Sequence, residues 1–168
     1  TITMEAMVPL RQKIFQRPDG DPKPLGYLTS DKHAETGGLG INLEVAISTL
    51  QMRENEDAPH VIGSPIFDDM YWSVFQMLAH HASGGCDLRS GDVYGSGTVS
   101  GTEKDQLGSL LEVTRGGKDI IELPNGEERT FLEDYDEVIM RAWCEKEGAT
   151  RIGFGECRSI ILPAPELT

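Results

Sequence analysis

The stretch best suited to binding a small molecule is rich in glycine and runs from Gly91 to Gly101. It is not a dinucleotide-binding fingerprint, because Ser100 stands where that pattern needs glycine, and no GKS or GKT follows as in a phosphate-binding loop. Glycines here would let the backbone approach a ligand closely, with the Thr98 hydroxyl and nearby amides as hydrogen-bond donors. The alternative is a glycine-rich β-turn that binds nothing.

Glu112 is the second candidate, because it stands among apolar neighbours. Alternation over residues 110–114 predicts a strand with Glu112 on the face opposite its two neighbours. In a cleft, partial loss of hydration would raise the proton affinity of this carboxylate and suit it to orient or deprotonate a catalytic group. On an open face it would be an ordinary solvated side chain.

Two other patterns resemble metal sites without matching them. His80 and His81 are adjacent, whereas two histidines that bind zinc from one helix stand about three or four residues apart. We therefore expect helix-end or surface contacts for both. The acidic run 133–137 lacks the spaced ligands and central glycine of a calcium loop, and we expect a solvated turn before a strand.

The elements that must position these residues are mostly strands. Short stretches that read as strands are 41–47, 110–114, 120–123, 137–144 and 158–162, with Gly153-Phe154-Gly155 between the last two. Gly116-Gly117 predicts a hairpin between the second and third of these, and Asn125-Gly126 predicts another turn. Short strands with one helix predict a mainly β fold of the α+β class, either a β-sandwich or a rolled sheet.

The main helix is predicted from about Asp68 to Ser83, with Ser64 or Asp68 as its cap. Apolar residues recur there at helical spacing and form a stripe of Tyr71, Val74, Phe75, Leu78 and Ala82. Gly84-Gly85 predicts the end of the helix, because glycine readily adopts positive φ.

Composition restricts the class of protein. The 168 residues suffice for one domain, 1–168, with a single core. A formal net charge of −13 would repel nucleic acid and an anionic membrane surface, so we expect neither as a partner. No apolar run approaches the roughly 20 residues that span a bilayer, and the start is not a secretory signal. Free thiols in a reducing cytosol are expected for Cys86, Cys144 and Cys157, so we predict a cytoplasmic location.

Short stretches along nearly the whole chain share one family's sequence pattern, in order and with plausible gaps. They are 21–25, 41–43, 70–72, 78–81, 85–92, 96–101, 108–112, 131–132 with 134 and 136–138, and 152–157. Any one stretch is a weak signal, but the ordered set is specific. By this set the chain resembles the fumarylacetoacetases.

The resemblance implies a rolled mixed β-sandwich of the fumarylacetoacetase C-terminal type, normally a homodimer. It implies a hydrolase that cleaves a C–C bond of a small diketo acid, 4-fumarylacetoacetate, to give fumarate and acetoacetate in tyrosine and phenylalanine degradation. In the family, Mg²⁺ or Ca²⁺ binds the diketo oxygens as a Lewis acid. A histidine activated by a glutamate generates the attacking hydroxide.

Only part of that inventory has a match in this chain. Glu112 matches the glutamate that orients the catalytic histidine, and Thr98 matches a threonine that contacts the substrate carboxylate. The metal-binding carboxylates, the catalytic histidine and the lysine have no match; residues 43–46 resemble the metal motif but carry alanine at its second carboxylate. Tyr135 stands where the family usually has glycine. We therefore expect the C-terminal part of a longer enzyme, inactive as an isolated chain.

Two alternatives stay open. The chain could be a non-catalytic binding or scaffold module that retains the fold. It could also belong to a related acylpyruvate-type hydrolase or a decarboxylase, although the segment from Tyr71 to His81 favours fumarylacetoacetase proper.

Overall fold

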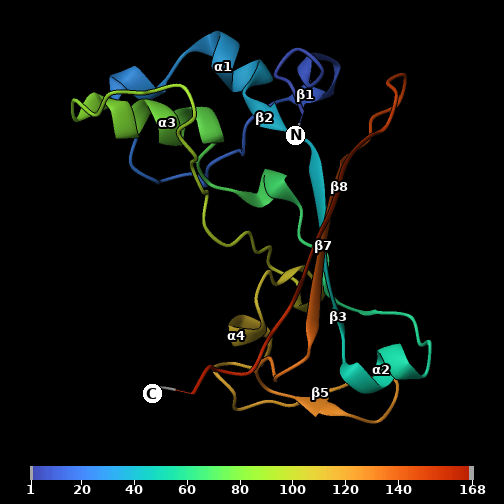
Figure 1. The fold of residues 1–168 in the computed structure, drawn as a ribbon. Coiled ribbons are helices and arrows are strands. Elements are labelled where there is room, and N and C mark those ends of the chain that lie inside the picture. Colours follow the sequence, from blue (N-terminus) through green and yellow to red (C-terminus); the bar gives the residue numbers. More distant parts are fainter. Residues whose placement is uncertain (1, 167–168) are drawn as a thin grey trace.

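The computed structural model describes residues 2–166, which are built around a four-stranded antiparallel sheet in the order β4-β3-β7-β8 (Figure 1). Strands β3 (Ile41–Ser48) and β7 (Glu137–Cys144) pair along their full length. Strands β4 (His60–Gly63) and β8 (Ile152–Ile160) form the two edges. Two small sheets pair β1 (Arg11–Gln12) with β2 (Gly38–Leu39) and β5 (Ile121–Glu122) with β6 (Glu128–Arg129). The α+β class with mainly antiparallel strands is confirmed.

The remaining elements are short helices. The α-helices are α1 (Asp31–Thr36), α2 (Leu50–Glu54), α3 (Val74–Ser83) and α4 (Leu110–Val113). The 3₁₀ turns are η1 (Val8–Leu10), η2 (Gly26–Leu28), η3 (Phe67–Asp69) and η4 (Lys104–Gln106). Within residues 2–166, none of these helices has the length and apolar character needed to cross a membrane.

The main helix begins later than predicted. Residues 67–69 form the separate turn η3, and α3 starts at Val74 with Ser73 as its N-cap, so Ser64 and Asp68 are not the cap. The Ser73 hydroxyl accepts from the Gln76 amide, and the Gln76 side chain accepts from the Ser73 amide, which satisfies two free donors at once. The predicted end is confirmed, with Gly85 at φ 86°.

The predicted strand over residues 110–114 is wrong. These residues form α4, because Ser109 caps a helical turn and leucine and glutamate are good helix formers. Gly116-Gly117 therefore does not close a hairpin; the observed hairpin joins β5 and β6 around Asn125-Gly126, as the second turn signal predicted. The last strand is also longer than predicted, since Gly153-Phe154-Gly155 lies inside β8.

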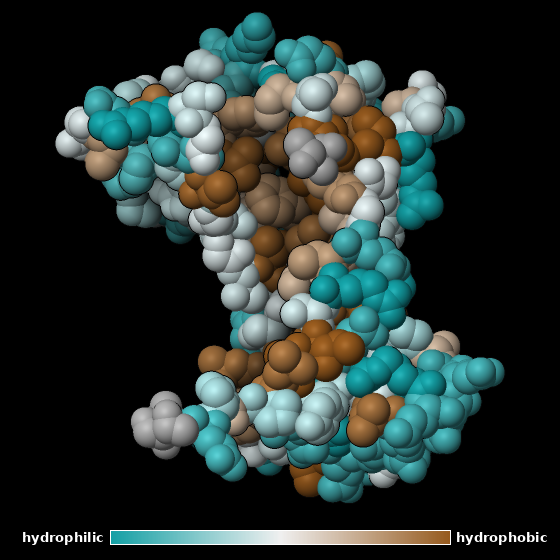
Figure 2. Space-filling model, viewed as in Figure 1, coloured by the Kyte–Doolittle hydropathy of each residue, from teal (hydrophilic) through white to brown (hydrophobic). Residues whose placement is uncertain are grey.

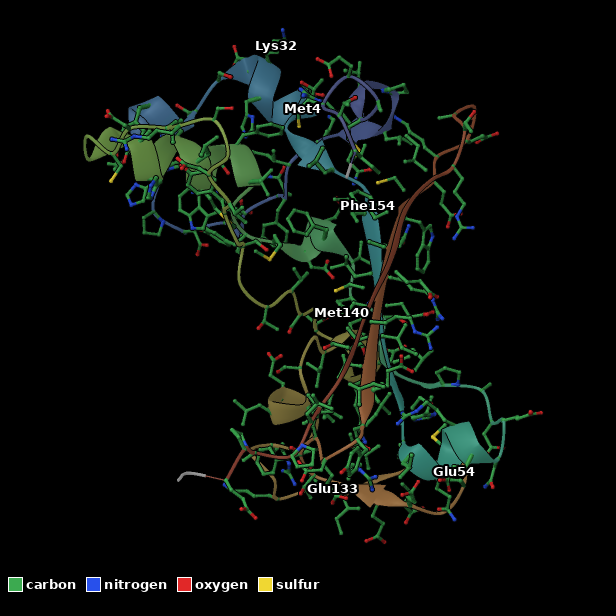
Figure 3. All side chains as sticks on the ribbon, viewed as in Figure 1. Met4, Lys32, Glu54, Glu133, Met140 and Phe154 are labelled. Carbon is green, nitrogen blue, oxygen red and sulfur yellow. The ribbon has the colours of Figure 1, made fainter. Side chains whose placement is uncertain are left out.

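Two separate hydrophobic clusters lie at opposite ends of the sheet. One contains Met7, Leu10, Leu39 and Cys144, and the other contains Ile47, Met52 and Leu123. Hydrophobic side chains are also visible in the hollow between the two ends (Figure 2). Met140 of β7 lies in this middle region, where it is 47% exposed (Figure 3). The long strands thus connect two packed ends across a less covered middle.

The acidic run 133–137 begins as the exposed turn that we predicted, but its last two residues are buried. Asp136 is fully buried and accepts from Arg129 Nε at 2.9 Å and Nη2 at 3.1 Å. Glu137 is also buried and pairs with Arg158 at 3.0 Å. The arginines come from β6 and β8, so neither pairing is visible in the acidic run itself. All three cysteines are free, as predicted, with Cys144 buried and Cys86 and Cys157 exposed.

Candidate functional site

The glycine-rich stretch has no regular secondary structure. The chain after it folds back, so that Gly108 contacts residues 98–99. A Cβ on Gly108 would lie 2.0 Å from the Val99 carbonyl oxygen and 3.0 Å from Thr98 Cγ2, so only glycine fits between them. The close approach is between parts of the chain itself. It places Thr98 next to the residues that lead into α4.

The carboxylate of Glu112 is fixed by two serine hydroxyls. Ser100 Oγ and Ser109 Oγ each donate to Glu112 Oε2 at 2.8 Å. Each hydroxyl also accepts a backbone N–H, Ser100 from Gly108 at 3.1 Å and Ser109 from Glu112 at 3.3 Å. A hydroxyl that accepts one bond and donates another has a defined orientation. The loop and the N-terminus of α4 therefore hold one carboxylate oxygen from two sides.

The other oxygen, Oε1, makes no hydrogen bond within residues 2–166. Glu112 is exposed rather than enclosed in a cleft, and no arginine or lysine among the described residues pairs with it. Its negative charge is therefore not neutralised locally. A carboxylate with one fixed oxygen and one free oxygen can orient an imidazole and stabilise the imidazolium that forms on it.

Thr98 lies in the loop and Glu112 lies in α4, and the two elements meet where Gly108 contacts the loop. Thr98 is exposed, and its hydroxyl makes no hydrogen bond in the part of the chain that the structure describes. The Thr98 hydroxyl is therefore free to donate to a ligand, from the same part of the loop as Ser100. Glu112 lies on a helical turn instead of the predicted strand, and the loop that carries Thr98 bonds to it through Ser100.

An apolar groove lies beside this loop. Its volume is about 440 Å³, and it is lined by Val45, Ile62, Leu110, Phe131, Leu132, Val138 and Met140 together with Gly108 and Ser109. Phe131 and Met140 are about half exposed there. The groove and Glu112 share Ser109, the cap of α4. A segment packed in this groove would therefore lie next to the carboxylate.

The described residues do not form a metal centre. Within residues 2–166, no group of three or more histidine, cysteine, aspartate or glutamate side chains could hold a metal ion. Glu44, in the segment that resembles the family's metal motif, instead pairs with Arg141 at 2.7 Å. His80 stacks on Tyr27, and His81 packs edge-on against Tyr94, which confirms helix-end contacts for both.

Ser100 and Ser109 are the site residues that sequence reasoning missed. For Ser109 a signal was present, since Ser109 and Glu112 have the S-x-x-E spacing of a capping box. For Ser100 no local pattern indicates the contact, because Glu112 lies twelve residues away and the loop must fold back at Gly108.

Comparisons with known proteins place this loop and sheet in one family. Residues 24–161 match the family described as "Fumarylacetoacetate (FAA) hydrolase C-terminal". The chain is 46% identical over 157 residues to the fumarylacetoacetase of Caenorhabditis elegans, covering 92% of this chain and 35% of that protein. It is 40% identical over 163 residues to the fumarylacetoacetases of Homo sapiens and Bos taurus, covering 97% of this chain and 36% of each relative.

The chain thus spans about a third of the length of these relatives. The match extends over most of its own residues, including Thr98, Glu112 and all four strands of the main sheet. The chain belongs to the fumarylacetoacetate hydrolase C-terminal family.

Proposed function

We propose that this chain forms part of a fumarylacetoacetase and supplies two residues of its active site, Glu112 and Thr98. The observation that carries the proposal is the Glu112 carboxylate, fixed at Oε2 by two hydroxyls and open at Oε1. Membership of a hydrolase family and the names of the relatives support it.

In this proposal the whole enzyme hydrolyses a C–C bond of 4-fumarylacetoacetate to fumarate and acetoacetate. Glu112 accepts an N–H from a histidine, keeps the ring oriented, and stabilises the imidazolium formed when the ring takes a proton from water. Thr98 donates a hydrogen bond to a substrate carboxylate. None of the chain's four histidines bonds to Glu112 in the described residues, so the catalytic histidine belongs to a segment outside this chain.

A divalent cation does not fit the residues of this chain, because residues 2–166 contain no group of ligands for it. The Mg²⁺ or Ca²⁺ of the family's chemistry would need ligands from elsewhere. The apolar groove next to Ser109 offers a surface on which such a segment could pack. We also propose a single partial domain, a homodimeric enzyme in the cytoplasm, and, from the charge of −13, no nucleic-acid or membrane partner.

The decisive experiment is a chimera in which this chain replaces the matched third of the C. elegans fumarylacetoacetase. We expect the chimera to hydrolyse 4-fumarylacetoacetate, and Glu112→Gln to lower kcat by about 100-fold or more, since a neutral amide cannot stabilise the imidazolium. Glu122→Gln is the matched control, because Glu122 is exposed and its side chain bonds to nothing described. An E112Q chimera with unchanged kcat would refute the assigned role.

The isolated 168-residue chain tests the other half of the proposal. We expect it to show no turnover and only weak binding of divalent cations. A diketo-acid hydrolysis rate from the pure chain would contradict the need for an external histidine. The intact mass of the natural polypeptide, together with the coding sequence upstream of Thr1, determines whether that histidine is encoded in the same chain.

A further inference from the structure

A second cavity, lined by neither Thr98 nor Glu112, lies between α3 and the proline-rich segment 18–24. Its volume is about 450 Å³, within the range of about 300–1,000 Å³ that is typical of ligand cavities. Its walls are mainly apolar and include Pro24, Leu25, Leu28, Trp72 and Met77. Such walls favour a ligand with a hydrophobic body.

Arg17 provides a positive charge in this cavity. Its guanidinium carbon lies 3.9 Å from the centre of the Trp72 ring and 4.7 Å from that of Tyr71. Arg17 Nη2 is shielded from solvent and has no hydrogen-bond partner among the described residues. Since Arg17 lines the cavity and forms no ion pair among the described residues, its positive charge remains available to a ligand carboxylate that reaches its other N–H groups.

Several other polar groups around the cavity already have partners. Tyr71 donates its hydroxyl to Asp21 at 2.7 Å, and His80 Nδ1 bonds to the Tyr27 hydroxyl at 2.9 Å. Gln76 is buried, with its amide donating to the Leu28 carbonyl at 3.0 Å and its oxygen accepting from Ser73. Arg17 and Lys23, which also lines the cavity, are therefore the cationic groups left to recognise a charged ligand.

We propose that this cavity binds a small carboxylic acid with a compact hydrophobic body. The carboxylate would accept hydrogen bonds from Arg17 and Lys23, since guanidinium and carboxylate have matching geometry. The body would pack against the leucine and methionine walls. A single negative charge suits the site better than a phosphate dianion, because Asp21, which is bonded to the Tyr71 hydroxyl, would repel a second charge more strongly.

The test uses the full chain and two probes of the same shape, 3-phenylpropionate and its neutral amide. Isothermal titration calorimetry should show that the acid binds at least about tenfold more tightly than the amide. Arg17→Gln should remove this preference. Arg151→Gln is the matched control, because Arg151 also lies over a tryptophan, Trp143 at 5.2 Å, but lines none of the cavity.

Equal affinity for acid and amide, or no binding of the acid at about 1 mM, would overturn the proposal. If Arg17→Gln does not fold, the indole N–H signals of the wild-type chain still give an answer. We expect the acid to shift the signal of Trp72 and not that of Trp143. A shift confined to Trp143, or none, would exclude binding in this cavity whatever the outcome of the chimera assay.

Discussion

Two carboxylates near the same end of the sheet are held in opposite ways. Asp136 is fully buried and bonded to both Nε and Nη2 of Arg129, and it also accepts the Glu133 amide at 2.9 Å. Glu112 is exposed and held by two neutral hydroxyls. The first carboxylate has its charge matched by a cation, whereas the second keeps its charge and one free oxygen.

The difference separates a structural role from the catalytic role that we propose for Glu112. Hydrogen bonds to Asp136 raise the pKa of Arg129 well above its usual value, so the arginine stays protonated beside this carboxylate. An ion pair of this kind fixes the turn at the start of β7 but has no capacity left for a substrate. Hydroxyls orient a carboxylate without neutralising it, which is what a residue that must orient a histidine needs.

The largest effect should come from breaking the buried pair. Asp136→Asn removes the partner of a buried cation and should lower the free energy of unfolding by about 3–5 kcal/mol. Urea denaturation of the isolated chain measures it. Asp134→Asn, an exposed aspartate in the same turn, should stay within about 0.5 kcal/mol of the wild type. A loss for Asp136→Asn no larger than for Asp134→Asn would mean that the pair does not stabilise the fold.

The second-largest effect should come from removing the hydroxyls of Ser100 and Ser109, which tests whether they position Glu112. In the chimera, Ser100→Ala and Ser109→Ala should each lower kcat by about 10- to 100-fold, because each removes a hydrogen bond to a charged oxygen. Ser100→Thr keeps the hydroxyl and should restore most of the rate. Ser96→Ala is the control, since Ser96 donates only to the Gly97 carbonyl. Failure of Ser100→Thr to restore activity would point to a packing role instead.

A third carboxylate, Asp68, is partly buried and has no paired cation among the described residues, so its titration should make the stability of the chain depend on pH. Burial, followed by the charge of Asp69, raises the pKa of Asp68 from 3.8 to about 6. Between these values the folded state binds the proton more tightly than the unfolded state, so the free energy of unfolding falls as pH rises from 3.8 to about 6. Above about pH 6, the contribution of Asp68 to the free energy of unfolding is fully lost.

Asp68→Asn should therefore flatten this fall and make the chain more stable than the wild type at pH 7 (thermal unfolding at several pH values measures both). Asp57→Asn changes an exposed loop aspartate and should leave the wild-type slope unchanged. If the Asp68→Asn variant keeps the wild-type slope, another group causes it.

The smallest effect concerns the turn that presents Asp136. Tyr135 has φ 69°, in the region that favours glycine, and its side chain is 45% exposed. Tyr135→Gly should raise the free energy of unfolding by about 0.5–1 kcal/mol, as relief of left-handed strain exceeds the entropy cost of glycine. Asp134→Gly, outside that φ region, should lower it. Stabilisation by both, or by neither, would contradict this account.

The long strands could be predicted because their signal is local. Residues 41–47 alternate regularly, and β7 was placed with its observed bounds, Glu137 to Cys144. The helix starts were missed although a local signal existed, since Ser73 with Gln76 and Ser109 with Glu112 both have capping-box spacing. Alternation over 110–114 was the misleading cue, because five residues are too few to distinguish a strand from one helical turn.

The burial of Asp136 and the contacts of Glu112 could not be predicted in the same way. Asp136 sits in a run of acidic residues that looks solvated, and only the fold of the β5–β6 hairpin brings Arg129 against it. Thr98 and Glu112 were identified through resemblance. That Ser100 reaches Glu112 depends on the backbone contact of Gly108 with Val99, which is a property of the folded loop.

Strand β8 also has a practical consequence for handling the protein. It pairs only with β7 among the described strands, so one row of its backbone groups along nine residues is open to another chain. Glu156 and Arg158 place opposite charges on it, and Gly155 adopts φ 81° within it; both features discourage strand-to-strand aggregation. High ionic strength screens such surface charges. The isolated chain should therefore be more soluble, and less prone to form fibrillar aggregates, in buffers of low salt.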